Sequence, residues 1–161
     1  MQTIVLRRAS LQDAARITEI YNSNPLFLQH HLGRCRVDES FVRNEMEEME
    51  RARFSSFLFV DLPEGDIVGL ADVKAGACAY LSLMMLDARL QRTGKGVLCY
   101  ALLEQELRRD GAHRVRIDVV CEYPENAKGF WSKQGFSPAG TTRLLWGGKE
   151  SEAVVMHKQL D

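Results

Sequence analysis

A short segment of small, polar and basic residues comes directly before an amphipathic stretch and is the first candidate for chemistry. It reads Gln91-Arg92-Thr93-Gly94-Lys95-Gly96. A helix begins with about four amides that have no intrahelical partner, and its dipole adds roughly half a positive charge there. A loop with little side-chain bulk allows an anion to approach several amides at once, and phosphate is the typical guest. The segment therefore predicts an anion-binding loop at a helix N-terminus.

The spacing of these residues differs from that of two common nucleotide-binding loops. A GxxxxGK[ST] loop needs a partner glycine at a spacing from Gly94 that the sequence does not offer, and a GxGxxG loop needs a glycine between Val97 and Leu102. What remains is Gln-x-x-Gly-x-Gly, which follows an apolar segment and opens a helix. A nucleotide-binding regulatory domain is disfavoured as well, because the sequence has no metal-binding aspartate near the loop.

The composition is that of an ordinary globular domain. The 161 residues are 45% hydrophobic and 27% charged, with a formal net charge of -1, so we expect one domain over 1–161 and neither nucleic acid nor an anionic membrane as partner. No signal segment or membrane-spanning run is present, which favours a cytoplasmic location. The four cysteines are scattered and lack zinc-ligand spacing. We therefore expect reduced thiols and no metal site.

The first half of the chain predicts two helices and four strands. Ser10 to Asp13 resembles a capping box, so a helix should begin there and run to about Tyr21, and Asp38 can cap a second helix. The strands are expected at 3–7, 56–62, 67–74 and 77–86, the second and third as a hairpin and the last one buried on both faces. The segment 26–37 follows no clear pattern and stays unassigned.

The second half alternates helices and strands. A helix is predicted from about Gly94 to Arg109, and a shorter one with Pro124 in its first turn and Gly135 at its end. The residues expected on the buried side of the first are Val97, Leu98, Ala101, Leu102 and Leu107. Strands are expected at 114–120, 141–146 and 152–159. Strand–helix–strand order requires parallel pairing and the two hairpins require antiparallel pairing, so a mixed α/β sheet is predicted.

At these residues the chain resembles the GNAT superfamily of acyl-CoA-dependent N-acyltransferases. The glycine loop matches the family's [RQ]-x-x-G-x-[GA] pyrophosphate loop, and FWSKQGF at 130–136 is similar to its aromatic-x-x-x-Gly-Phe ending. The order of elements also matches over nearly the whole chain. The resemblance implies an α/β (α+β) fold, with a mixed, mostly antiparallel sheet, a parallel and splayed fourth and fifth strand, and helices on both faces. It implies acetyl-CoA as cofactor and is silent on the acceptor.

The resemblance also implies which residues lie along the cofactor. They are Met84, Met85, Leu86, Gln91, Arg92, Thr93, Gly94, Lys95, Gly96, Asn126, Phe130 and Trp131. The main chain of 84–86 would pair with the pantetheine arm, while the side chains of these three residues pack in the core. The amides of 91–96 would hold the pyrophosphate, and the helix after the fifth strand would line the thiol end.

The chain departs from the family where catalysis is concerned. Trp131 stands where many relatives carry a tyrosine that protonates the leaving thiolate, and an indole N–H is not a usable acid. The strand at 77–86 has no carboxylate to serve as base. Tyr123, just after the fifth strand, is the candidate for protonating the thiolate; the competing interpretation is an interfacial loop tyrosine.

Four further side chains have both a functional and a structural explanation. Ser82 could position a water or be an ordinary strand serine, and Cys121 could form an acyl-enzyme or be a buried thiol. His30 and His31 lie in the segment that borders the acceptor site in the family. Either could bind substrate or act as base, or the pair could be a solvated loop.

Two functions from different classes follow from these residues. The first is an N-acetyltransferase that moves an acetyl group from acetyl-CoA to a primary amine by direct attack in a ternary complex, with a small molecule or a peptide as acceptor. The alternative is a non-catalytic acyl-CoA-binding sensor or partner-binding module, which the missing tyrosine and strand carboxylate favour. A homodimer is common in the family, and no segment here requires one.

Overall fold

The computed structural model describes residues 3–160 of the chain. Its elements are β1 (Thr3–Arg8), η1 (Leu11–Asp13), α1 (Ala14–Asn22), α2 (Pro25–Leu32), α3 (Glu39–Arg51), β2 (Ser55–Leu62), β3 (Asp66–Lys74), β4 (Cys78–Leu86), η2 (Ala88–Leu90), α4 (Lys95–Arg109), β5 (Arg114–Val120), α5 (Lys128–Lys133), β6 (Ser137–Trp146) and β7 (Lys149–Gln159). The strands form one sheet in the order β1-β2-β3-β4-β5-β7-β6. The β4/β5 pair is parallel and the other neighbours are antiparallel. The predicted mixed sheet is confirmed.

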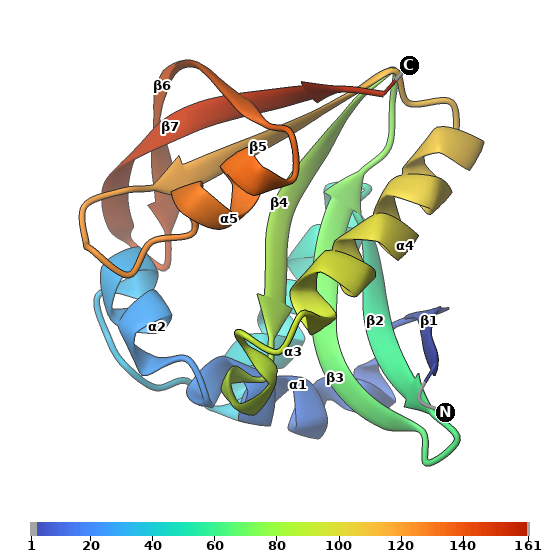
Figure 1. Ribbon diagram of the computed structural model, residues 1–161. Helices are drawn as coiled ribbons and strands as arrows, with labels where there is room; N and C mark the ends of the chain where they lie inside the picture. The colour runs from blue at the N-terminus through green and yellow to red at the C-terminus, as the bar shows by residue number, and fades with distance from the viewer. Residues whose placement is uncertain (1–2, 161) are drawn as a thin grey trace.

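Helices cover both faces of this sheet, as Figure 1 shows. On one face α4 and α5 bury a cluster that includes Phe59, Leu103 and Trp131. On the other face α1, α2 and α3 bury a second cluster around Ile20 and Leu58. Leu58 and Phe59 lie in different clusters because successive side chains of a strand point to opposite faces. Two separate cores therefore hold the central strands in place from both sides.

The first helices begin at the caps that the sequence predicts. The Ser10 amide donates to the Asp13 carboxylate over 2.8 Å, which completes a capping box at the 3-10 turn η1 before α1. The Phe41 amide donates to Asp38 over 2.8 Å at the start of α3. The unassigned segment contains α2, which has Pro25 in its first turn and ends at Gly33 with a φ of 77°.

The predicted buried face of α4 is largely wrong. Val97 and Leu98 are 49% and 58% exposed, and Ala101 is exposed too, whereas Leu107 is buried as expected. The residues that face the sheet are Cys99, Tyr100, Leu103 and Leu107. The sequence contains two overlapping apolar stripes of helical period, and the aliphatic stripe is the wrong one. Tyr100 decides the phase because its ring packs edge-on against both Trp131 and Phe136.

The helix predicted at Pro124 begins four residues later, at Lys128. Asn126 explains the delay, since its side-chain amide donates to the Tyr123 carbonyl over 2.7 Å and its side-chain oxygen accepts from the Lys128 amide over 2.9 Å. An asparagine that bonds its own neighbourhood in this way stabilises a turn. Residues 124–127 are therefore a turn that precedes α5. The final hairpin also has longer strands than predicted, because β6 begins at Ser137 and β7 at Lys149.

Candidate functional site

The sheet opens between β4 and β5. The two strands pair in parallel from Cys78 opposite Arg114 to Tyr80 opposite Arg116, and pairing stops there although β4 continues to Leu86. Figure 1 shows the strands separating from a shared upper end, with β4 running down and β5 running to the left. The predicted splay is therefore confirmed. The remaining residues of β4, 81–86, have no strand neighbour on the β5 side, so main-chain groups there are available to an extended ligand.

The direction of these main-chain groups follows from strand alternation. The Asp87 amide donates to the Val68 carbonyl over 2.9 Å, so Asp87 faces β3, as Met85 does through its carbonyl oxygen, which approaches Gly69. Residues two apart share a direction, and their neighbours face the other way. Met84 therefore directs its N–H and C=O into the opening. The Met85 side chain is buried in the core, as predicted for the side chains of 84–86.

The Leu86 carbonyl already has a partner. The side-chain amide of Asn24 donates to it over 2.9 Å, and the Gln91 side-chain amide donates to the Asn24 side-chain oxygen over 2.6 Å. Asn24 thus ties the end of β4 to the start of the glycine loop. In the sequence, Asn24 lies only in the segment that breaks the first helix, and its two partners lie 62 and 67 residues away. No local signal could have identified this contact.

The glycine loop turns sharply into α4. Arg92 has a φ of 62° and Gly94 a φ of 85°, both in the left-handed region, and Gly94 caps the helix without a side chain. The Thr93 hydroxyl donates to the Leu90 carbonyl, and the Lys95 ammonium pairs with Asp61 of β2 over 2.8 Å. The side chains of Thr93 and Lys95 thus form contacts with other parts of the protein. The main chain of the first helical turn is left to face an anion.

Helix α5 reaches the loop through Phe130. A Cβ built on Gly96 would lie 3.2 Å from a ring carbon of Phe130 and 3.6 Å from the Leu86 side chain. The loop, the end of β4 and α5 therefore meet at Gly96, where no side chain fits without displacing the ring. Asn126 caps the turn before α5, so its side chain is already hydrogen-bonded.

Trp131 belongs to the core beneath this point. It is 7% exposed and packs edge-on against Tyr100, Phe130 and Phe136, with ring centroids 5.4, 5.0 and 5.2 Å away. Such edge-to-face pairs stabilise beyond the area they bury. The indole supports Phe130 from below. Contact of Asn126, Phe130 and Trp131 with a cofactor stays a prediction.

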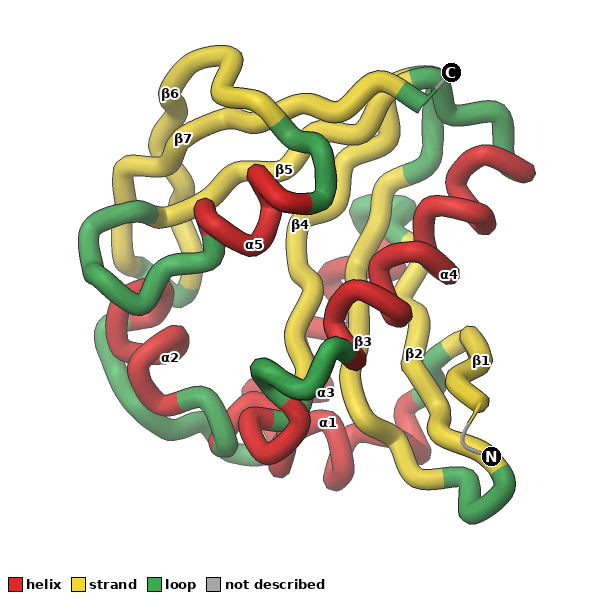
Figure 2. Tube along the Cα trace, in the orientation of Figure 1, coloured by secondary structure: helices red, strands yellow, loops and turns green. Residues whose placement is uncertain are grey.

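Helix α2 runs from the end of β4 to the segment that follows β5. Asn24, which precedes it, contacts the end of β4, and His30 near its other end stacks on Tyr123, with ring centroids 4.1 Å apart and planes 1° apart. Figure 2 shows α2 beside the loop that follows β5. Tyr123 is buried, which raises its pKa, so its hydroxyl keeps its proton at neutral pH. An acid is therefore held at the end of β5.

Two other candidates have structural partners. The Ser82 hydroxyl donates to the Asp72 carbonyl over 3.3 Å, as an ordinary strand serine does. Burial raises the pKa of the Cys121 thiol, which disfavours the thiolate that an acyl-enzyme needs. A recess of about 210 Å³ lies next to Cys121, lined further by Glu122, Thr141, Glu152, Ala153 and Val154. The side-chain oxygen atoms of Glu122, Thr141 and Glu152 can accept hydrogen bonds from a ligand in this recess.

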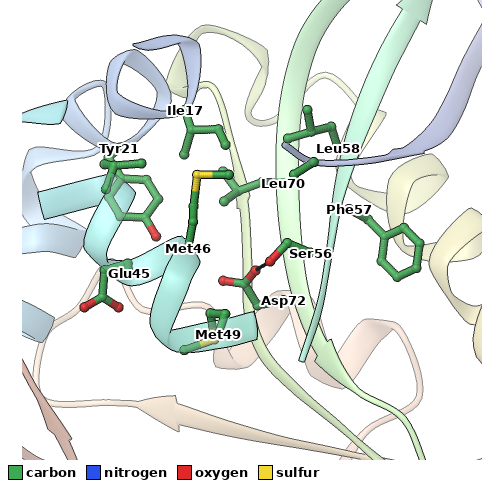
Figure 3. A pocket seen from close by; sticks show the side chains of 12 residues that line it. Ile17, Tyr21, Glu45, Met46, Met49, Ser56, Phe57, Leu58, Leu70 and Asp72 are labelled. Carbon is green, nitrogen blue, oxygen red and sulfur yellow. Dashed lines mark hydrogen bonds between the residues drawn. The ribbon is translucent and has the colours of Figure 1, made fainter. Parts of the chain in front are cut away.

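A second cavity, lined mostly by apolar side chains, lies away from the opening, between α1, α3 and strands β2 and β3 (Figure 3). Its volume is about 10 Å³, enough for about one water. Asp72 is 7% exposed there and accepts a hydrogen bond from Ser56, and the Tyr21 hydroxyl points toward the same space. Burial raises the Asp72 pKa to about 6, with Ser56 lowering it and Glu45 raising it further. The ionised form of Asp72 therefore destabilises the folded protein.

We expect Asp72→Asn to stabilise the protein at pH 8. An unfolded Asp72 ionises near 3.8 and the folded one near 6, so stability falls as pH rises through this window and stays lower above it. This difference in pKa corresponds to about 3 kcal/mol in the free energy of unfolding. Asparagine can still accept from Ser56. Urea unfolding at pH 8 and pH 3 measures the difference, which should nearly vanish at pH 3, below both pKa values; a variant less stable at pH 8 would show that the charge is compensated.

Comparison with known proteins agrees with this geometry. Residues 28–147 match the family model described as an acetyltransferase (GNAT) domain. An acetyltransferase from Thermus thermophilus superposes with a TM-score of 0.77 at 23% identity, over 98% of this chain and 97% of that one. The ribosomal-protein-S18-alanine N-acetyltransferase of Escherichia coli gives 0.73 at 17% identity, over 99% and 95%. The yncA protein of Salmonella typhimurium, solved with its cofactor acetyl-CoA, gives 0.68 at 21%, over 99% and 95%.

The search among curated proteins gave no match. Within residues 3–160, no helix is both long and apolar enough to cross a membrane.

Proposed function

Because this chain belongs to the GNAT acetyltransferase family, whose members use acetyl-CoA, we propose that it transfers the acetyl group to a primary amine by direct attack in a ternary complex. The observation that carries the proposal is the unpaired end of β4, which lies next to the glycine loop at the splayed opening between β4 and β5. An extended arm fits along Met84, and an anion fits at the start of α4. The acceptor is a small molecule or a peptide that presents its amine from the side of α2.

The residues of the site fit acetyl-CoA in three respects. The first turn of α4 offers amides to a pyrophosphate, with open space beside Gly94 for close approach. Met84 offers one N–H and one C=O to the amides of a pantetheine arm. Phe130 flanks both. Bound acetyl-CoA supplies an activated thioester carbonyl, and the protein supplies position and protons.

Tyr123 is the proposed acid. Its raised pKa keeps the hydroxyl protonated, and its position just after β5, with the ring stacked on His30 of α2, supports this role. As the C–S bond breaks, the departing sulfur takes the proton. The missing carboxylate on β4 and the tryptophan at 131 then require no replacement, since the acid comes from the loop before α5. His30 fixes the plane of the phenol by stacking on it.

The test of function is release of CoA from acetyl-CoA in the presence of a panel of amines. It should be quantified by chromatography, because the exposed thiols of Cys35 and Cys78 would react with a thiol reagent. We expect at least one amine to give turnover and an acetylated product. Binding of CoA without turnover on any amine would favour the alternative, a non-catalytic acyl-CoA-binding module.

Replacement of Tyr123 by phenylalanine should lower kcat by about 100-fold, the lower range for loss of a general acid. The ring and its stack on His30 are retained, so the Kd for CoA and the melting temperature should stay near those of the wild type. Steady-state kinetics on any accepted amine, with calorimetric titration of CoA, checks both. Unchanged kcat would return Tyr123 to the role of an interfacial loop residue.

A further inference from the structure

The hydrogen bond of His31 determines its tautomer. Its Nδ1 lies 2.8 Å from the Phe27 carbonyl oxygen, one helical turn earlier in α2. A carbonyl oxygen can only accept, so Nδ1 carries the hydrogen. In a neutral imidazole the other nitrogen, Nε2, then holds the lone pair. Within residues 3–160 Nε2 makes no hydrogen bond, so this lone pair is available to a ligand.

The surroundings keep the ring neutral. Burial is the main cause that lowers the His31 pKa, to about 4, and the nearby charges of Lys149 and His30 lower it too. The hydrogen bond to the Phe27 carbonyl is the second-largest effect on this pKa and raises it, as Glu122 does to a smaller extent, but burial outweighs both. At neutral pH the ring is therefore uncharged and able to accept a proton.

Three aromatic rings hold His31 in place at the side of the opening. Phe27 stacks on it with a centroid distance of 3.8 Å, and Tyr123 and Trp146 meet it edge-on at 6.1 and 6.4 Å. Trp146 is itself fixed by a 2.8 Å hydrogen bond to Glu45. The proposed acid and a neutral imidazole thus lie together where α2 meets the end of β5.

Resting on the proposed function, we propose that His31 Nε2 accepts the proton that the acceptor amine loses. The amine nitrogen bonds to the acetyl carbonyl carbon and the C–S bond breaks. The nitrogen's proton goes to Nε2, while the sulfur takes the proton of Tyr123. The imidazolium then returns its proton to the phenolate, directly or through water. The nitrogen becomes acidic as its bond to carbon forms, so a weak base suffices.

This role assigns different work to the two adjacent histidines. His30 lies flat against Tyr123, and its carbonyl accepts from the Lys149 ammonium over 2.9 Å. His30 therefore orients the Tyr123 ring and links α2 to β7. His31 stands edge-on to the same tyrosine with its lone pair unused. His31 differs from His30 in its geometry, because the Phe27 carbonyl and the stacked Phe27 ring fix the imidazole with Nε2 left for a ligand.

The test compares His31→Gln and His31→Ala on an amine that the wild type accepts. We expect kcat to fall by about 100-fold in both, with an unchanged Kd for CoA, since His31 lies on the side of α2. Added imidazole should restore part of kcat in His31→Ala only, because only that variant leaves room for the ring. His113→Gln, at the other end of β5, is the control and should match the wild type.

Rescue by imidazole separates proton transfer from a packing role, and a melting curve shows whether each variant is folded. Wild-type kcat in a folded His31→Gln overturns the inference, as does a folded His31→Ala that imidazole does not restore. Either result leaves the proposed function intact. A wild-type protein inert toward every amine would instead defeat the proposed function itself.

Discussion

Replacement of Gly96 by glutamate should abolish binding of CoA while the protein stays folded. The new side chain would start 3.2 Å from Phe130 and 3.6 Å from Leu86, at the point where the loop, β4 and α5 meet. It would add bulk and a negative charge where a pyrophosphate must approach the first turn of α4. We expect the Kd to rise by at least about 100-fold, or about 2.7 kcal/mol. Calorimetric titration with CoA measures it.

The matched control is Gly96→Gln, which has the same bulk without the charge. It should weaken binding less than glutamate does, and the difference reports the electrostatic share. Raising the salt concentration should reduce this difference, since exposed charges are screened. A folded Gly96→Glu that binds CoA with wild-type affinity would refute the assignment of the loop.

The glycine loop was predictable from sequence because its chemistry is local. The spacing of Gly94 and Gly96 after a buried strand and before a helix needs no distant partner to be recognised. The parallel pairing of β4 with β5 follows in the same way from the order strand, helix, strand. Both predictions depend on patterns that lie within one continuous stretch, residues 78–120.

The α2 side of the site could not be predicted, because contacts between residues far apart in the sequence form it. Asn24 acquires its role only when Leu86 and Gln91 are brought to it, and the sequence could not choose between His30 and His31, which contact Tyr123 in different ways. The prediction of the buried face of α4 was wrong for a related reason. Both apolar stripes have helical period, and a contact between Tyr100 and the core selects between them. Long-range packing overrides the local pattern.

The site therefore has two parts, one formed by the glycine loop and β4 and the other formed by α2 and the residues that contact it. The loop and β4 are fixed by main-chain geometry, whereas the α2 side depends on stacked rings and on Asn24. Substitutions in the first part should change binding of CoA, and substitutions at Tyr123 or His31 should change kcat. Trp131 belongs to neither part, since it lies in the core that supports Phe130.

Replacement of Trp131 by alanine should therefore act first on stability. The indole is buried among Tyr100, Phe130 and Phe136, and truncating such a ring typically costs about 3–5 kcal/mol. Loss of the support under Phe130 should also weaken CoA binding in the fraction that stays folded. Urea unfolding gives the free energy, and titration at low temperature gives the affinity.

Trp131→Tyr is the matched variant, because it keeps an aromatic ring in the same pocket. Its loss of stability should be smaller than that of alanine, and its affinity for CoA close to that of the wild type. The new hydroxyl would lie among core rings, away from the end of β5, so kcat should not rise. An increase in kcat would show that residue 131 reaches the reacting atoms, and Tyr123 would then lose its place as the acid. If Trp131→Ala unfolds at the same urea concentration as the wild type, the ring supports neither the core nor Phe130.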